Sequence, residues 1–315
     1  MKKLLSIYVL MSMLIFSYSC DDGVDEELFD KYVLLTENGW KDKQMEITAD
    51  NKVKVLVTAS ISGTSANDRD VSVNVKFDPD TLQGYNFEKY RNQTGLYYSE
   101  LPSAAISFDN RNISIASGKD HGETYLTLDI DQIDNKYADY VIPITIESAS
   151  EYTIARDAYS KALLHVQLKN SFSGDYSGDL NVYRTNSGGG NESGDENKIS
   201  VGTKSFYAIS NDQCYFYAGQ FSRTTADREK FIVNITIDDD GNITMDSPNP
   251  ELDLKQESAS IEITKEAHKT DNRYEVVITK LDLKYTFKDL STLDKPMLRA
   301  QGAITMQQNV KIKSE

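Results

Sequence analysis

Short runs in which apolar and polar residues alternate recur along most of the chain. Val71, Val73 and Val75 are separated by polar residues, and similar runs lie near residues 53–61, 126–130, 142–146 and 164–168. Successive side chains of a β-strand point to opposite faces of its sheet, so this period of two predicts strands with one buried face. Gly, Asn, Asp and Ser, which favour turns, separate the runs. The first half of the chain is therefore expected to form an antiparallel β-sandwich of the immunoglobulin-like type.

One aromatic segment does not follow this alternation. Residues 80–102 carry five aromatic side chains without a period of two, namely Tyr85, Phe87, Tyr90, Tyr97 and Tyr98. We expect a short helix followed by a packed loop that crosses one end of the sandwich.

A domain boundary is predicted at Asn170–Gly178, where Ser and Gly are frequent. It divides the folded part into residues 32–170 and 171–315. Strands are expected near residues 205–209, 213–218, 231–237, 274–287 and 298–306, with Asp240 and Gly241 turning a hairpin. Residues 185–197 contain no core residue and are expected to form a surface loop. The second domain is thus predicted to be all-β, either a closed antiparallel barrel resembling a lipocalin meander or a second sandwich.

The N-terminus reads as a signal peptide over residues 1–19. Two lysines precede an apolar run at residues 4–16, and small residues lead to Cys20. The run is shorter than the ~20 residues that a membrane-spanning helix requires. A Cys after small residues resembles a bacterial lipobox, which implies that Cys20 is lipidated and that the acidic residues 20–31 form a tether. The alternative is ordinary secretion with an incidental Cys20.

The chain is strongly acidic. Its formal net charge is −15, and removal of residues 1–19 takes away two lysines and no acid, which leaves −17. Such a surface repels phosphate groups, so nucleic acid and anionic lipid are excluded as partners. Cys214 is the only other thiol, so no internal disulfide is expected once Cys20 is lipidated.

Several segments resemble a known family. In the first half these are YNFEKY, LPSAAISF, ISIASG and YVIPITIESAS, and in the second YSGDL, CYFYAG, ADREKFIVNITIDDDGNI and AQGAITM. They are similar to segments of two-domain surface lipoproteins of Bacteroidota encoded in polysaccharide-utilisation loci, whose first domain resembles one that precedes chitinase-like endo-glycosidases. The resemblance implies an outer-membrane lipoprotein facing the cell exterior. Its expected partners are a polysaccharide or oligosaccharide, an outer-membrane importer and a SusD-like receptor.

Catalytic and metal signatures are not recognisable in the sequence. The chain has only His121, His165 and His268, none beside a recognisable nucleophile. Asp129, Asp131 and Asp134 lack the Gly and Glu that an EF-hand loop needs. We therefore expect no enzyme, no metal and no cofactor. His165 is expected to be a partly exposed structural residue on the strand face opposite Leu164 and Val166, and Trp40 an edge-packing residue rather than a stacking platform.

Aromatic side chains remain as candidate ligands for sugar rings, whose C–H faces stack on Tyr or Trp beside polar groups. The candidate glycan site comprises Tyr215, Tyr217, Gln220 and Arg223, with Tyr97 and Tyr98 as the second cluster. Cys214 and Phe216 alternate with the first two tyrosines and are the more apolar pair, so they are expected to face the core. The opposite register stays open for a closed barrel, in which the tyrosines would line a cavity.

The leading hypothesis is a non-catalytic surface lipoprotein that captures glycans for import. The alternative is a structural or adhesive surface lipoprotein that binds another protein. A third, less favoured hypothesis is an enzyme of undetected type.

Overall fold

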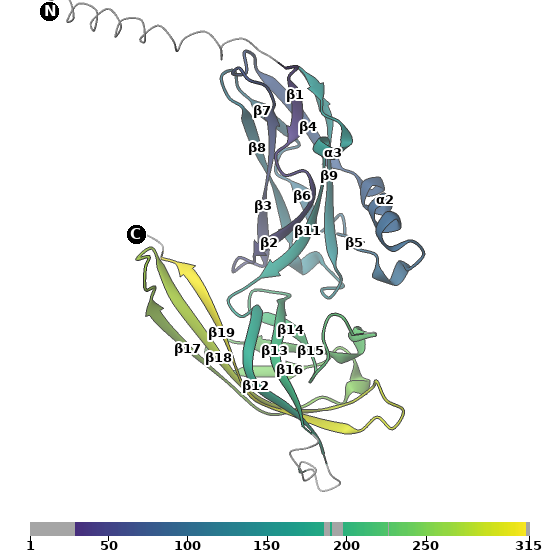
Figure 1. The fold of residues 1–315 in the computed structure, drawn as a ribbon, viewed down its shortest axis with the longest axis vertical. Helices are drawn as coiled ribbons and strands as arrows, with labels where there is room; N and C mark the ends of the chain where they lie inside the picture. Colours follow the sequence, from purple (N-terminus) through teal and green to yellow (C-terminus); the bar gives the residue numbers. More distant parts are fainter. Residues whose placement is uncertain (1–28, 186–189, 191–197, 226, 313–315) are drawn as a thin grey trace, which may run out of the picture.

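The computed structural model describes residues 29–185, 190, 198–225 and 227–312, which form two β domains stacked along the long axis of the molecule (Figure 1). This confirms the predicted all-β class. The signal peptide, Cys20 and most of the tether lie outside the described residues, as does most of the predicted loop at 185–197. None of the helices in the described ranges combines the length and apolarity needed to cross a membrane.

The first domain is a sandwich of two sheets. One has the strand order β10-β1-β3-β8-β6, and the other β2-β11-β9-β4-β7, with β5 added beside β9. The strands of the first sheet are β1 (Tyr32–Leu35), β3 (Lys52–Ile61), β6 (Ile106–Phe108), β8 (His121–Asp129) and β10 (Thr153–Ile154). Those of the second are β2 (Gly39–Glu46), β4 (Val71–Phe77), β5 (Ser99–Glu100), β7 (Asn112–Ile115), β9 (Tyr140–Ala149) and β11 (Lys161–Lys169). The two short helical turns η2 (Ile130–Gln132) and α3 (Asp157–Ser160) lie between strands.

The core between these sheets explains the alternation in the sequence. Val53 and Val55 of β3 are buried while the lysines beside them are exposed, and Val73 and Val75 of β4 follow the same rule. Strand β9 differs, because six consecutive residues from Val141 to Ile146 are buried. Both faces of β9 are covered, the inner one by the opposite sheet and the outer one by a helix.

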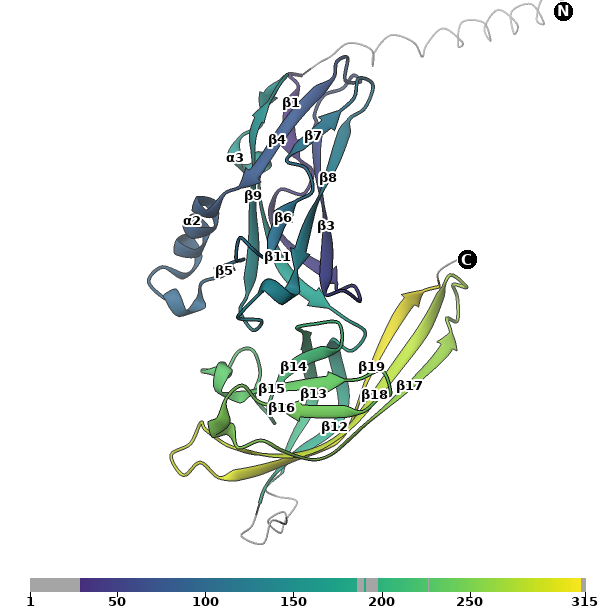
Figure 2. The same ribbon diagram turned by 180° about the vertical axis from the view of Figure 1, so that it is seen from behind.

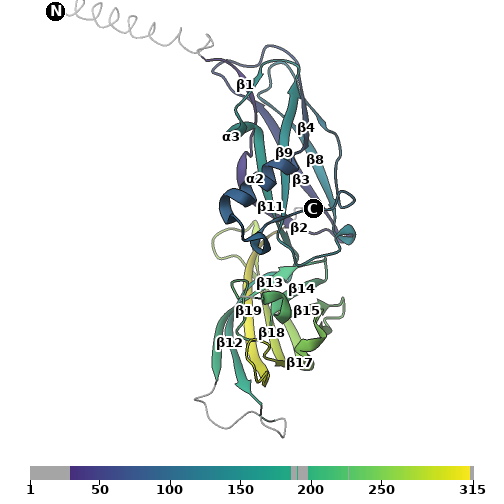
Figure 3. The ribbon, with the colours of Figure 1, turned by 90° about the vertical axis from the view of Figure 1, so that its right-hand side faces the viewer.

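That helix, α2 (Pro79–Tyr90), begins with Pro79 at a position where a missing N–H costs nothing. Its Leu82 packs against Val141 and Leu163 on the outer face of the second sheet. The expected helix therefore exists, but it lies along this face (Figure 3) and not across an end of the sandwich. Val141 and Leu163 form an apolar patch on the outer face of this sheet, and the helix shields the patch from water. After η1 (Thr94–Leu96), the chain is held to the helix by reciprocal hydrogen bonds between the Asn86 amide and the backbone of Tyr98, at 2.9 and 3.0 Å.

The second domain is one eight-stranded sheet curled into a nearly closed barrel (Figure 2). Its order is β16-β15-β14-β13-β12-β19-β18-β17. The strands are β12 (Gly174–Arg184), β13 (Ile199–Ala208), β14 (Gln213–Tyr217), β15 (Ile232–Ile237), β16 (Ile243–Asp246), β17 (Lys255–Ala267), β18 (Tyr274–Lys288) and β19 (Met297–Lys311), with η4 (Arg228–Phe231) and η5 (Pro250–Leu252) between strands. At the seam between β16 and β17, the Gln256 side chain accepts from Met245 N and donates to Ile243 O, both at 2.8 Å. One amide thus joins the two edges where no strand pairing is found among the described residues.

Glycine allows β12 and β19 to approach at a bulge. Gly302 has φ +144°, and a Cβ added there would lie 1.9 Å from the carbonyl oxygen of Asp179. The register of β12 shifts nearby, between Ser177 and Leu180. The sequence segments YSGDL and AQGAITM therefore face each other across this contact.

Two details of the second domain differ from expectation. The hairpin at Asp240 and Gly241 exists, but five residues connect Ile237 to its partner Ile243, and only Gly241 has a positive φ. The Asp238 side chain accepts from the backbone of Asp240 and Asn242, which stabilises this wider turn. Strand β17 was not predicted, because most of its residues are exposed and only Ala259 and Ile261 are partly buried against the core.

The segment between the domains is fixed by Asn170. This buried side chain donates to the carbonyl oxygens of Ser210 (2.8 Å) and Gln213 (3.1 Å) and accepts from Phe172 N at 3.0 Å. Cys214, whose pKa burial raises to about 12, lies 3.2 Å from the same amide oxygen. The short connection from β11 to β12 is therefore tied to the β13–β14 turn.

Candidate functional site at the domain junction

An acidic residue of the first domain forms the centre of the junction. Asp139, just before β9, makes ion pairs with Arg223 and with Arg228, the latter at 3.3 Å. Both arginines belong to the segment between β14 and β15 of the second domain. Burial and the neighbouring charge of Arg228 lower the pKa of Arg223, but a guanidinium stays charged at neutral pH. A single carboxylate thus holds two cations that would otherwise repel each other.

Tyrosines of the second domain lie beside this ion-pair centre. Tyr207 of β13 stacks on Tyr215 of β14 with ring centroids 5.0 Å apart, and Tyr217 packs edge-on against both. Tyr137 of the first domain meets Tyr215 edge-on at 5.3 Å, and its hydroxyl donates to Asn234 Oδ1 at 3.0 Å. The outer surface of the barrel is therefore covered here by the first domain.

The predicted strand register for Tyr215 and Tyr217 agrees with the structure, but their predicted accessibility does not. Phe216 packs against Phe206 and Tyr285 inside the barrel, whereas Tyr215 and Tyr217 lie on the opposite face. Nevertheless they are only 5% and 3% exposed, so neither offers an open ring to a sugar. This burial raises the pKa of both phenols. Tyr207, which pairs with Tyr215 across β13 and β14, is half-exposed and offers the more accessible ring.

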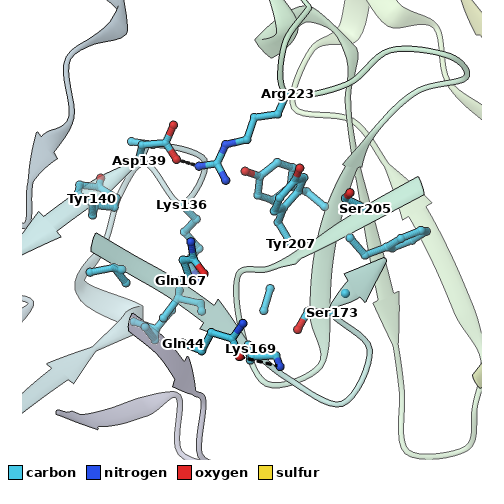
Figure 4. Close-up of a pocket in the computed structure, with 18 of the residues that line it drawn as sticks. Gln44, Lys136, Asp139, Tyr140, Gln167, Lys169, Ser173, Ser205, Tyr207 and Arg223 are labelled. Carbon is cyan, nitrogen blue, oxygen red and sulfur yellow. Dashed lines mark hydrogen bonds and ion pairs between the residues drawn. The ribbon is translucent and has the colours of Figure 1, made fainter. Parts of the chain in front are cut away.

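A first hollow, with a volume of about 340 Å³, opens between the two domains (Figure 4). We call it the basic hollow because Lys136, Lys169 and Arg223 line it together with only two acids, Asp139 and Asp175. Both acids are engaged: Asp139 pairs with Arg223, and Asp175 accepts a hydrogen bond from Ser205 Oγ at 2.6 Å. Its other polar and aromatic lining residues include Gln44, Gln167, Ser173, Tyr140, Tyr207 and Tyr215.

A second hollow, of about 450 Å³, lies on the other side of Asp139. We call it the aromatic hollow because Tyr90, Tyr97, Tyr98 and Tyr137 line it. The second domain contributes Arg228, Glu229 and Asn249, which supply polar groups opposite the rings. Ala138 and Asp139 line both hollows, so the two form one interdomain cleft with Asp139 between them.

The wall behind Tyr98 is a packed cluster around Trp40. The indole stacks on Tyr85 at 4.8 Å and contacts Tyr98 at 4.8 Å and His165 at 5.3 Å. Lys89 lies 5.0 Å from the Tyr98 ring and donates to its hydroxyl at 3.1 Å. Trp40, on the edge strand β2, is thus an edge-packing residue that supports Tyr98.

His165 was expected to be partly exposed, and this was wrong. It does lie on the face opposite Leu164 and Val166, but α2 and the segment after it cover that face, and the residue is 7% exposed. Its Nδ1 lies 2.7 Å from Asp42 Oδ1, and this hydrogen bond lowers the pKa of Asp42. His165 Nε2 is buried, 3.9 Å from Asp139 Oδ1, and makes no hydrogen bond to any residue that the structure describes.

The structure brings together residues that the sequence assigned to alternative sites. Tyr97 and Tyr98 line the aromatic hollow, while Tyr215 and Arg223 line the basic hollow. Gln220 lines neither hollow, and its buried Oε1 has no hydrogen-bond partner in the described part of the chain. Within the described ranges, no group of three His, Cys, Asp or Glu side chains is arranged to hold a metal ion.

The chain is similar to two family models and to solved structures from Bacteroides. A family model described as a domain of unknown function (DUF4973) matches residues 24–150, and a model of a C-terminal domain matches residues 160–308. A solved structure of unknown function from Bacteroides ovatus has a TM-score of 0.76 at 23% identity, covering 90% of this chain and 98% of its own. An auxiliary nutrient binding protein from Bacteroides thetaiotaomicron has a TM-score of 0.73 at 21% identity, covering 87% and 92%. No curated protein matches the chain. At these identities the likeness establishes the two-domain fold.

Proposed function

We propose that this chain is a non-catalytic glycan-binding protein that holds a polysaccharide or oligosaccharide in its interdomain cleft. The observation that carries the proposal is the aromatic hollow, where four tyrosines face polar side chains from the other domain. Sugar rings stack on such side chains while their hydroxyls bond to polar neighbours. The similar fold of the auxiliary nutrient binding protein supports a binding role.

The chain works, in this proposal, as a lipoprotein of the outer membrane that faces the exterior, anchored through Cys20. It presents its ligand to an outer-membrane importer and a SusD-like receptor. The sequence order of a basic start, an apolar run and Cys20 supports the anchor. The similar solved structures come from Bacteroides, a genus of the phylum whose lipoproteins the sequence segments resemble.

The state of the acids in the cleft supports binding rather than hydrolysis. Glycosidases use two carboxyl groups about 5–9.5 Å apart, one protonated and one free to attack or to activate water. Here Asp139 is held by two guanidinium groups, Asp175 is engaged by Ser205, and Glu229 of the aromatic hollow lies 3.9 Å from Arg228 Nε. Each of these three acids is thus engaged by a cation or a hydroxyl group.

The test is retention on affinity gels that contain soluble polysaccharides. Tyr97, a half-exposed ring of the aromatic hollow, is changed to Ala, and Tyr125→Ala on the exposed surface of β8 is the matched control. A lost stacking contact is expected to weaken binding about ten-fold. Tyr125→Ala should bind like the wild type.

Equal retention of the Tyr97→Ala and wild-type proteins would refute this site. Release of reducing sugar from a retained polysaccharide would instead show an enzyme.

A further inference from the structure

The basic hollow concentrates cations in a protein whose surface is otherwise acidic. The whole chain has 34 Lys and Arg against 49 Asp and Glu, yet three cations and two acids line this hollow. Arg228 adds a further positive charge on the opposite side of Asp139. The lining of the basic hollow therefore carries an excess of positive charge, which is opposite in sign to the net charge of the protein.

Lys136 has a cationic group that no acid neutralises. It is half-buried, and within the described part of the chain its ammonium makes no hydrogen bond or ion pair. Figure 4 shows its side chain extending into the hollow, as Gln167 does from β11. Removing an ammonium from water without a counter-charge is unfavourable. An anionic group of a ligand that binds beside Lys136 would therefore form a favourable charge-assisted hydrogen bond.

Lys169 and Arg223 strengthen the same preference. Lys169 donates to Gln44 Oε1 at 3.2 Å, a neutral acceptor that leaves its charge uncompensated. Arg223 pairs with Asp139, but it also lies over the Tyr207 ring at 5.2 Å, so its guanidinium borders an aromatic surface inside the hollow. A planar ring beside cationic donors suits a sugar that carries a negative group.

Resting on the proposed glycan-binding function, we propose that the basic hollow binds an anionic sugar residue through Lys136, Lys169 and Arg223. The anionic group is a uronate carboxylate or a sulfate ester, since both present several oxygens to ammonium and guanidinium donors. The aromatic hollow then holds neighbouring sugars of the same chain. The size of the basic hollow lies within the range of about 300–1,000 Å³ usual for small-ligand sites.

The experiment is calorimetric titration of the full chain with matched acidic and neutral polymers in about 0.15 M NaCl, where distant protein charges are largely screened. Polygalacturonate and hyaluronate are each compared with their carboxyl-reduced forms, and a sulfated galactan with its desulfated form. We expect at least one acidic polymer to bind about ten-fold more tightly than its neutral partner. Which pair shows the difference distinguishes carboxylate from sulfate.

The decisive variant is Lys136→Gln, which keeps a polar side chain of similar length and removes the charge. It should weaken binding of the acidic polymer several-fold, because Lys169 and Arg223 remain, and it should leave neutral binding unchanged. Lys119→Gln, at an exposed position of the first domain, is the control and should change neither. Tyr97→Ala should weaken both polymers.

Equal affinity for acidic and neutral partners in every pair overturns the inference, and so does unchanged acidic binding by Lys136→Gln. Loss of binding in Tyr97→Ala together with either result would leave the proposed glycan site standing and remove only its preference for an anion.

Discussion

Lys204 is a buried lysine whose charge should make the stability of the second domain depend on pH. It lies on the inner face of β13, 4% exposed, and donates to the carbonyl oxygens of Gly219 at 2.6 Å and Phe221 at 2.8 Å. A neutral amine has two N–H groups, and these match the two acceptors. The third N–H of the ammonium form has no acceptor within the described residues.

The size of the effect follows from the pKa. Burial lowers the pKa of Lys204 from its ordinary 10.5 to about 7. Between these values the unfolded chain binds a proton that the folded chain does not, so the free energy of unfolding rises with pH. With about 1.4 kcal/mol per pKa unit, the gain between pH 6 and pH 9 is about 2–3 kcal/mol. Below pH 7 the folded chain is also protonated and the dependence levels off.

The measurement is urea denaturation at several pH values, comparing the wild type with Lys204→Met. The variant keeps the volume and removes the titration, so the difference between the two unfolding free energies should rise with pH by the same 2–3 kcal/mol. Taking this difference removes contributions from the three histidines and other shared groups. Lys41→Met, at an exposed position, should follow the wild type. A pH-independent difference between wild type and Lys204→Met would refute the reasoning.

Three further predictions concern the junction, the barrel and the anchor. Asp139→Asn leaves Arg223 without its ion-pair partner and Arg228 with only Glu229, 3.9 Å away, and should lower the unfolding free energy by about 1–2 kcal/mol in denaturant titrations, a value reduced for partial exposure; no change would deny the ion pairs a structural role. Gly302→Ala places a Cβ against the Asp179 carbonyl and should cost about 2 kcal/mol or more, whereas Gly202→Ala, with open space around it, should cost less than about 1 kcal/mol; equal melting temperatures of the two variants would contradict the close contact. Cys20→Ala should abolish partitioning with membranes, and normal processing and partitioning of the variant would rule out lipidation.

The alternation of apolar and polar residues predicted the features that depend on one strand and its immediate neighbours. The strand pattern of β3 and β4 was readable because each has one buried face. The register of β14 was also correct, with Phe216 inside the barrel. The burial of Tyr215 could not be read, because part of its cover is Tyr137, which lies far away in the sequence in the other domain.

The same limit applies to polar residues. Alternation with Phe206 places Lys204 inside the barrel, but a lysine is usually assigned to the solvent side, and its acceptors come from a loop after β14. Lys136 follows no motif at all, since its significance arises only when two domains enclose it. Residue chemistry therefore suggested aromatic and polar side chains as candidates, while their assembly in one interdomain cleft required the fold.

The cleft is preorganised on both sides, which bears on how it would bind. On the first domain, Asn86 fixes the backbone of Tyr98 and Trp40 supports its ring. On the second, Asn170 ties the interdomain connection to the β13–β14 turn. Side chains that are already ordered lose little conformational entropy on binding, so in the proposed function more of the free energy of each sugar contact would be retained as affinity. Because a glycan that reaches both hollows contacts both domains, its binding and the docking of the domains are thermodynamically linked: each stabilises the other by the same free energy.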